Sequence, residues 1–101
     1  MYARLTFLEV DASNIKEVSN IYNSEIVPAI REFQGLLDAI LLESTDNNGQ
    51  VISLTTWKTK EDADVYESSG TYRQLVDKLK DKYTSKPVLK TYDVVESAVT
   101  A

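Results

Sequence analysis

Aromatic side chains with polar groups are the residues of this chain best suited to chemistry, and several lie in one stretch. The segment TTWKTKEDADVYESSGTY, residues 55–72, holds the only tryptophan, Trp57, and two of the six tyrosines, Tyr66 and Tyr72. A phenol or an indole can pack against a planar ligand and also donate a hydrogen bond to it. The segment therefore predicts either an aromatic wall around a small molecule or the packed junction of a strand and a helix.

The chemistry open to the chain is limited by two residue types that it lacks. Its 101 residues include no Cys and no His. A thiolate nucleophile, a Ser–His pair, a Cys/His zinc site and a haem held by a proximal His are therefore excluded. Proton transfer near neutral pH would fall to a carboxylate, to a Lys or Tyr with a perturbed pKa, or to the substrate itself.

Tyr22, Trp57 and Tyr72 are the candidate substrate-binding residues, and each has an alternative role in the core. Tyr22 and Tyr72 fall on apolar helical faces, and Trp57 ends a predicted strand, so all three could instead be packing residues. Arg31 and Arg73 could bind an anionic substrate, but exposed arginines on helices are common, and neither is included in the predicted site. No metal site is predicted, because the acidic residues after Trp57 favour a helix dipole and lack EF-hand spacing.

Composition and charge indicate an ordinary soluble domain. Hydrophobic residues make up 43% of the chain and charged residues 27%, with a net charge of −5. Five lysines lie on or near the segment 77–90, but Asp77 and Asp81 interleave with them, which indicates a solvated helix face. This acidic chain is therefore not expected to bind nucleic acid. No apolar run is long enough for a membrane helix, and no signal-peptide pattern is present, so a cytoplasmic location is expected.

The first half of the chain predicts a strand, a long helix and a second strand. Residues 2–10 favour a strand, and DASN after them supplies turn and cap chemistry, with Ser13 as the expected helix N-cap. Apolar residues then repeat at helical spacing, and Pro28 inside this pattern is expected to kink or divide the helix. Gly35 fits a C-terminal cap, and residues 36–44 form the second predicted strand. The apolar helical positions are Ile15, Val18, Tyr22, Ile26, Ala29, Ile30 and Phe33.

The second half predicts a hairpin, two helices and a last strand. Asn48–Gly49 is a strong hairpin signal, and residues 51–57 form the returning strand. Thr59 begins a pattern that resembles a capping box, at the start of a short helix that ends near Gly70. An amphipathic helix follows, and the strand 88–96 is the last element. The apolar positions of this second helix are Tyr72, Leu75, Val76, Leu79 and Tyr83.

This element order predicts an α+β fold. The order β-α-β-β-α-α-β is that of a ferredoxin-like subunit, with an antiparallel four-stranded sheet and helices on one face. The strands 36–44 and 51–57 carry apolar residues at neighbouring positions, which indicates that both sheet faces are buried. A chain of 101 residues has too few helices to cover both faces, so a homodimer is predicted. We expect one domain over residues 1–96 and a loose tail at 97–101.

One long stretch resembles a known family. Residues 28–75 read PAIREFQGLLDAILLESTDNNGQVISLTTWKTKEDADVYESSGTYRQL. The helix ending in Pro28 and Gly35, the hairpin, the strand ending in Trp57 and the KEDADVYESSG helix resemble the antibiotic biosynthesis monooxygenase family of dimeric α/β barrels. The resemblance implies that two sheets face one another in a dimer and that each subunit can hold a pocket between its sheet and helices. It also implies that Tyr66 lies on the pocket-facing helix, which makes Tyr66 the candidate catalytic residue.

The haem-degrading branch of this family is excluded by three positions. That branch has an Asn in its first strand, a Trp on the helix after the tryptophan-ended strand, and an axial His ten residues further on. Here no Asn occurs in residues 1–10, Tyr66 has the place of the Trp, and Val76 has the place of the His. Other members oxidise quinols or polyketide aromatics with no metal or flavin, and the resemblance implies this chemistry.

The leading hypothesis is a cofactor-independent monooxygenase-like homodimer that acts on a small aromatic or quinol substrate. No cofactor is expected. Two alternatives stay open: a non-catalytic dimer that binds a small molecule, and a structural or interaction module whose own side chains fill its interior. The fold alone cannot distinguish these three functions.

Overall fold

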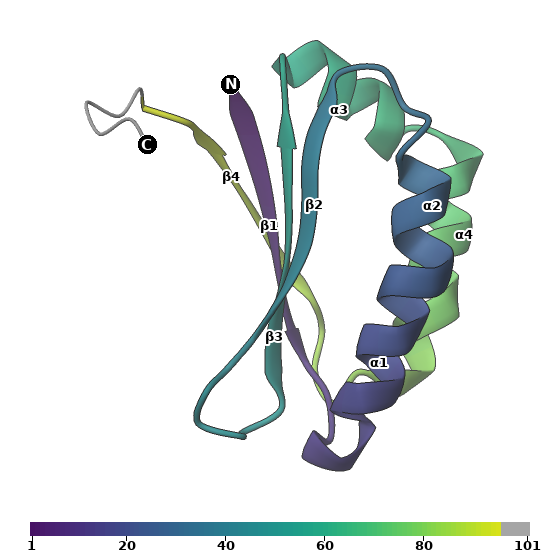
Figure 1. Cartoon of the computed structure of the whole chain (residues 1–101), viewed down its shortest axis with the longest axis vertical. Helices are drawn as coiled ribbons and strands as arrows, with labels where there is room; N and C mark the ends of the chain where they lie inside the picture. Colours follow the sequence, from purple (N-terminus) through teal and green to yellow (C-terminus); the bar gives the residue numbers. More distant parts are fainter. Residues whose placement is uncertain (96–101) are drawn as a thin grey trace.

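A four-stranded antiparallel sheet with helices packed on one of its faces forms the two layers of the protein (Figure 1). The computed structural model describes residues 1–95, so the predicted tail 97–101 and the end of the predicted domain lie outside the described residues. The strand order is β2-β3-β1-β4, which places β1 and β3 in the centre of the sheet. The strands are β1 (Tyr2–Glu9), β2 (Leu36–Glu43), β3 (Gln50–Trp57) and β4 (Val88–Asp93).

The helical layer contains one long helical run and a corner of two shorter helices. The long run consists of α1 (Ile15–Ile21), a π-helical turn (Tyr22–Ile26) and α2 (Val27–Ile30). The corner consists of α3 (Lys60–Glu67) and α4 (Gly70–Leu79), and short 3₁₀ turns lie at Ala12–Asn14 and Lys80–Lys82. This order confirms the predicted ferredoxin-like α+β fold.

Pro28 does not divide the first helix. The π-helical turn comes immediately before α2, and the Val27 N–H bonds to the carbonyl of Tyr22, five residues earlier. A proline in an α-helix removes one hydrogen bond and its ring collides with the preceding turn. The wider π turn gives the chain room for Pro28, so the helix continues to Ile30.

Two predicted helix boundaries are wrong because neighbouring polar side chains cap the helices instead. Ser13 is not the N-cap of α1 but lies within the preceding 3₁₀ turn, whose N-cap Asp11 accepts hydrogen bonds from the Ser13 N–H and hydroxyl at 3.0 and 2.7 Å. The N-cap of α1 is Asn14, which makes no side-chain capping hydrogen bond. Gly70 does not end the short helix, which stops at Glu67, but begins α4. Ser69 caps α4, because its hydroxyl oxygen accepts a hydrogen bond from the Tyr72 N–H at 3.1 Å.

The hairpin and the predicted cap at Thr59 are confirmed. β2 and β3 pair in an antiparallel manner around a turn in which Asn47 and Gly49 have left-handed backbone angles. The Thr59 hydroxyl oxygen accepts a hydrogen bond from the Asp62 N–H at 3.1 Å, which caps α3. The last strand is shorter than predicted, since β4 ends at Asp93.

The two faces of the sheet carry different kinds of side chain. On β1, Arg4, Thr6 and Leu8 face the helices, because they line a cavity with helical residues. The alternate residues of β1, Ala3, Leu5 and Phe7, therefore face away from the helices. The residues that pair with these three on β3 and β4, and the β2 residues next to those on β3, share this second surface. We call this second surface the outer face. Its apolar residues are Ala3, Leu5, Phe7, Ile40, Leu42, Ile52, Leu54, Val88 and Tyr92, and Asp38, Thr56 and Lys90 lie on it as well.

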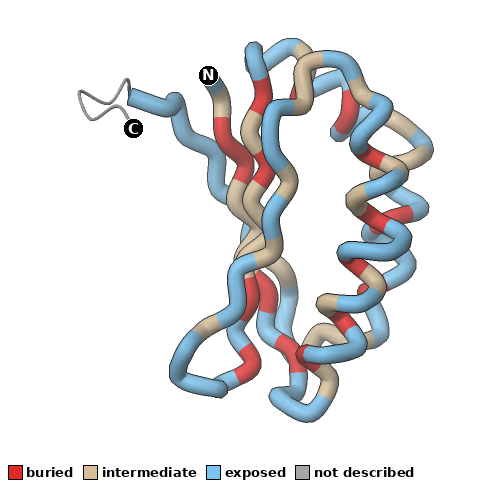
Figure 2. The backbone as a smooth tube through the Cα atoms, in the orientation of Figure 1, coloured by how far each residue is buried: buried red, intermediate tan, exposed pale blue. Residues whose placement is uncertain are grey.

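The outer face is mostly apolar and partly exposed. Figure 2 shows that the edge strands β2 and β4 are largely exposed, whereas buried positions concentrate in the central strands and on the helices. Ile40, Leu42, Val88 and Tyr92 each keep between 42% and 50% of their surface exposed. The structure therefore agrees with the prediction that apolar residues occupy both faces of the sheet.

We expect Gly49→Ala to destabilise the fold strongly. Gly49 has a φ of +81°, and an added Cβ would overlap the carbonyl oxygen of Val10. The left-handed conformation and the overlap together should lower the free energy of unfolding by more than about 2 kcal/mol in urea denaturation.

Gly70→Ala is the matched control for this glycine substitution. A Cβ at Gly70, the first residue of α4, meets no atom within 4 Å. This variant should be as stable as the wild type or up to about 1 kcal/mol more stable. An equal loss of stability in both variants would contradict the assigned role of Gly49.

Candidate functional site

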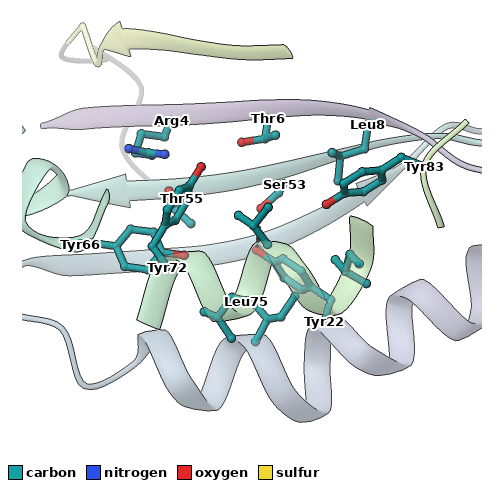
Figure 3. Close-up of a pocket in the computed structure, with 13 residues that line it drawn as sticks. Arg4, Thr6, Leu8, Tyr22, Ser53, Thr55, Tyr66, Tyr72, Leu75 and Tyr83 are labelled. Carbon is teal, nitrogen blue, oxygen red and sulfur yellow. Dashed lines mark hydrogen bonds between the residues drawn. The ribbon is translucent and has the colours of Figure 1, made fainter. Parts of the chain in front are cut away.

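A small cavity lies between the sheet and the helices (Figure 3). Its volume is about 80 Å³, and side chains from β1, β3, the long helical run, α3 and α4 surround it. We call it the inner cavity. Its thirteen lining residues are Arg4, Thr6, Leu8, Tyr22, Ile26, Ser53, Thr55, Tyr66, Tyr72, Leu75, Val76, Leu79 and Tyr83.

Polar side chains from the two central strands form the floor of the inner cavity. Figure 3 shows Arg4 and Thr6 on one strand and Ser53 and Thr55 on the next, all labelled along the sheet side of the cavity. The Ser53 hydroxyl donates a hydrogen bond to the phenolic oxygen of Tyr22 at 3.2 Å. The floor is thus a row of hydroxyls with one guanidinium, in a place where a packed core would carry apolar groups.

Tyr66 is held by a cluster of aromatic rings. The Trp57 ring stacks on it with a centroid separation of 5.3 Å, and Phe33 and Tyr72 meet it edge-on at 5.1 and 5.2 Å. Such contacts stabilise a ring beyond the burial of its surface and fix its orientation. Tyr66 therefore lies in one defined position at the wall of the inner cavity.

Three of the four predicted site residues come together at the inner cavity. Tyr22, Tyr66 and Tyr72 line it, whereas Trp57 is fully buried behind Tyr66. The Trp57 indole N–H donates a hydrogen bond to the Thr55 hydroxyl at 3.0 Å, so its polar group is satisfied within the protein. The roles that the sequence suggested for these four residues stay predictions.

Arg4 is the lining residue that sequence reasoning missed. Only 4% of its surface is exposed, although arginine is rarely buried. Its Nη1 lies 3.4 Å from the Glu67 carboxylate, and its Cζ lies 5.3 Å from the ring centroid of Tyr72 and 5.9 Å from that of Tyr66. The strand alternation that places Arg4 beside Thr6 on one face was visible in the sequence, but it does not say which face the helices cover.

Burial raises the pKa of three of the phenols that line the inner cavity. Burial raises the pKa of Tyr66; the neighbouring Tyr72 adds to this rise, whereas the Arg4 charge opposes it. Burial also raises the pKa of Tyr22, against the opposing effect of the Ser53 hydrogen bond, and the pKa of Tyr83. At neutral pH these phenols can donate hydrogen bonds to a ligand oxygen, but they do not serve as phenolate bases.

None of the described residues that line the inner cavity is a carboxylate. Within residues 1–95, no cluster of three or more acidic side chains is placed to hold a metal ion. In the same part of the chain, no helix combines the length and apolar character needed to cross a membrane. The arrangement can position a small aromatic molecule and donate hydrogen bonds to it, but the lining includes no ordinary general base.

A second, larger cavity adjoins the first at the corner between α3 and α4. Its volume is about 610 Å³, and we call it the outer basin. Tyr72 and Val76 line both the inner cavity and the outer basin, so these two side chains separate the two spaces. The remaining residues of the basin are Glu67, Ser68, Ser69, Gly70 and Arg73.

The inner cavity is smaller than a typical ligand site, which measures about 300 Å³ or more. It has about 80 Å³, which is room for about three water molecules at their volume in the liquid. A ring-sized ligand would therefore need the boundary side chains Tyr72 and Val76 to move, so that the cavity opens into the outer basin. Tyr72 is partly buried and Val76 is 38% exposed, so neither is enclosed in the core.

Comparison with protein families and curated sequences gives one match. A family model described as antibiotic biosynthesis monooxygenase matches residues 1–78, more than three quarters of the chain. No curated protein sequence matches the chain significantly.

Several solved structures share the fold. A monooxygenase from the gene ActVA-Orf6 of Streptomyces coelicolor, in complex with the ligand nanaomycin D, superimposes with a TM-score of 0.85 at 13% identity; the match covers 99% of this chain and 92% of that one. A candidate antibiotic biosynthesis monooxygenase of Deinococcus radiodurans gives 0.83 at 17% identity, over 100% of this chain and 99% of that one. A similar protein of Nitrosomonas europaea gives 0.80 at 18% identity, over 95% and 100%. At these identities the similarity shows a common fold.

We expect Tyr66→Phe to make the protein less sensitive to alkaline pH. Burial holds the pKa of Tyr66 above the value of about 10 in an unfolded chain, so the folded state resists losing this proton. The stability from this difference is fully present below about pH 10 and is lost as pH rises from there toward the folded pKa, because the unfolded chain releases the proton first.

Urea unfolding at about pH 8 and about pH 11 measures this effect. The free energy of unfolding should fall by about 1 kcal/mol less in the variant than in the wild type between these two pH values. Equal losses in the two proteins would show that the Tyr66 hydroxyl is not shielded from water.

Proposed function

The chain belongs to the antibiotic biosynthesis monooxygenase family, and we propose that it oxidises a small phenolic or quinol substrate with dioxygen in the inner cavity, without a metal or a flavin. The observation that carries this proposal is the polar floor under the helices. Hydroxyls and a buried guanidinium face four tyrosines across the inner cavity, where apolar packing would otherwise be expected. This is the environment that positions an electron-rich ring and its oxygen.

In the proposed reaction the substrate supplies all the electrons. A bound phenolate passes an electron to dioxygen, and recombination of the two radicals forms a carbon–oxygen bond. The new bond forms at a ring C–H position ortho or para to the phenolate oxygen and gives a hydroperoxide. Loss of water from this hydroperoxide converts the attacked carbon into a carbonyl, so that AH₂ + O₂ gives AO + H₂O. One oxygen atom enters the product and the other leaves as water, and no external reductant is needed.

The protein contributes position and hydrogen bonds. The neutral phenols of Tyr22 and Tyr66 would donate to the developing oxygen anion, an arrangement that stabilises charge most in a cavity closed to water. Tyr72 would pack against the substrate ring at the boundary of the cavity. Trp57 would act through Tyr66, by holding that ring in place.

A second candidate function is non-catalytic binding of the same kind of molecule. It is favoured by the lining itself, because neither a carboxylate nor another ordinary base is present to remove a proton. Turnover distinguishes the two functions: both predict saturable binding, and the first alone predicts consumption of dioxygen.

We also propose that the protein is a homodimer, paired through the outer face. The apolar residues of this face come from all four strands, and no element among residues 1–95 covers them. An exposed surface on which apolar residues predominate over a few polar ones is typical of an interface between protein chains. A second copy presents the same surface, and a two-fold axis would bring the two sheets face to face.

We expect dioxygen consumption with substituted hydroquinones and dihydroxynaphthalenes, measured with an oxygen electrode. Tyr66→Phe should lower kcat/KM by about tenfold or more, because a hydrogen bond to the oxygen anion is lost in the transition state. Trp57→Ala should lower it as well, since Tyr66 loses its stacked partner.

Val65→Ala is the control for both substitutions. Val65 precedes Tyr66 on α3 and is 63% exposed, so its truncation should leave kcat/KM unchanged. Tight binding of these compounds without any uptake of dioxygen would contradict the proposed reaction and leave the binding function.

We expect light scattering at micromolar concentration to give about twice the chain mass of 11.4 kDa. Ile40→Lys should raise the dimer dissociation constant by about 100-fold or more, because dimerisation would bury an unpaired charge. Val65→Lys, at an exposed position on α3, should leave the dimer intact. A stable wild-type monomer would rule out pairing through the outer face.

A further inference from the structure

We propose that Arg4 recognises an anionic oxygen of the ligand, and that the Glu67 carboxylate occupies Arg4 until the ligand replaces it. The ligand class is a planar aromatic anion, that is, a ring with a phenolate or carboxylate oxygen. This inference rests on the proposed function in one respect, since it places the ligand in the inner cavity. It does not depend on whether the ligand is oxidised.

A single carboxylate balances the buried charge of Arg4, although no buried side-chain nitrogen or oxygen in residues 1–95 lacks a hydrogen-bond partner. The side chain is 5% exposed, and a guanidinium has five N–H donors in a planar fork. Among residues 1–95, Glu67 is the one carboxylate paired with it, through a single contact of 3.4 Å. A charge-assisted hydrogen bond is typically about 2.7–2.9 Å long, so the Arg4–Glu67 pair is loose.

The two residues of this ion pair line two different cavities. Arg4 lines the inner cavity, and Glu67 lines the outer basin. The Glu67 side chain is 45% exposed, so its carboxylate can return to water at little cost, whereas the Arg4 charge cannot. The ion pair thus crosses the boundary between the two spaces, beside Tyr72 and Val76.

An anionic ligand can replace Glu67 without changing the charge balance at Arg4. A ligand oxygen that enters from the basin meets the exposed Arg73 first and then Arg4. An oxygen anion on Arg4 keeps the guanidinium paired while Glu67 becomes hydrated at the surface. A neutral ligand offers no such replacement, and this difference is the basis of the proposed selectivity.

The surroundings of Arg4 also favour a flat ligand. The titratable groups that face its guanidinium are Glu67, Tyr66 and Tyr72, and the last two present aromatic rings to it at 5.9 and 5.3 Å. Figure 3 shows Arg4 above these two tyrosines at one end of the inner cavity. A planar ring with its anionic oxygen directed at Arg4 would extend along the hydroxyl floor toward Ser53.

The test is a binding titration of the full chain with 4-nitrophenol, whose phenol and phenolate forms have separate visible absorption bands. 4-Nitroanisole, which has the same ring without an ionisable oxygen, is the neutral probe. The wild type should bind the phenolate at least about tenfold more tightly than the neutral probe. Binding should also shift the ionisation of 4-nitrophenol to lower pH, because the guanidinium stabilises the anion.

Two substitutions should act in opposite directions. Arg4→Met keeps an apolar side chain of similar length and should abolish the preference for the phenolate. Glu67→Gln removes the competing carboxylate at a half-exposed position and should tighten phenolate binding by about threefold or more. Arg31→Met and Glu61→Gln, at exposed positions outside both cavities, should change neither value.

Each other outcome has a defined meaning. Equal binding of both probes, unchanged in Arg4→Met, would overturn the inference and leave the proposed function intact. Weaker phenolate binding in Glu67→Gln would overturn the proposal that Glu67 competes with the ligand for Arg4. This measurement does not need the Arg4→Met variant, so it can be made even if that variant does not fold. The absence of saturable binding of either probe would overturn the inner cavity as a ligand site and the inference with it. Arg4-dependent binding of 4-nitrobenzoate would support the same site and identify carboxylates as a second source of the anion.

Discussion

The alternation of side chains along the central strands β1 and β3 is the constraint on which both surfaces of the sheet depend. A sheet with one wet face normally turns its apolar residues toward the helices and its polar residues toward water. Here Arg4 and Thr55 face the helices, whereas Leu5 and Leu54 face away. The helix side therefore keeps a polar floor with room above it, and the opposite side keeps an apolar surface. The proposed ligand site and the proposed dimer interface thus both depend on the same residue pattern.

Aromatic packing makes the polar floor compatible with a stable core. The guanidinium of Arg4 would be costly to bury among aliphatic side chains, because these offer nothing to a positive charge. The faces of Tyr66 and Tyr72 attract a cation instead, and Glu67 supplies the balancing charge. Trp57 stacks behind Tyr66 and so fixes one of these faces. The cluster that looked like a strand-to-helix junction in the sequence is also the support for a buried charge.

The order of the elements could be predicted from the sequence, because it depends on local periodicity, turns and caps. The same periodicity placed Tyr22 and Tyr72 on helical faces that meet the inner cavity. The place of Arg4 could not be predicted in this way: alternation tells which residues share a face, but only the packing of the helices decides which face is covered. The outer basin was also missed, since it lies at the α3–α4 corner, where Ser69 caps a helix two residues after another has ended.

Alternate residues of β1 face the inner cavity and the outer face, and this arrangement restricts where residues can be inserted or deleted during evolution. A one-residue insertion or deletion within Tyr2–Glu9 would turn every following side chain of the strand to the opposite face. Arg4 or its neighbours would then enter the apolar surface, and leucine and phenylalanine would fill the cavity. The tip of the β2–β3 hairpin has no such restriction, because residues 45–48 are exposed and belong to no strand. Natural length variation should therefore accumulate at the hairpin and be nearly absent from β1.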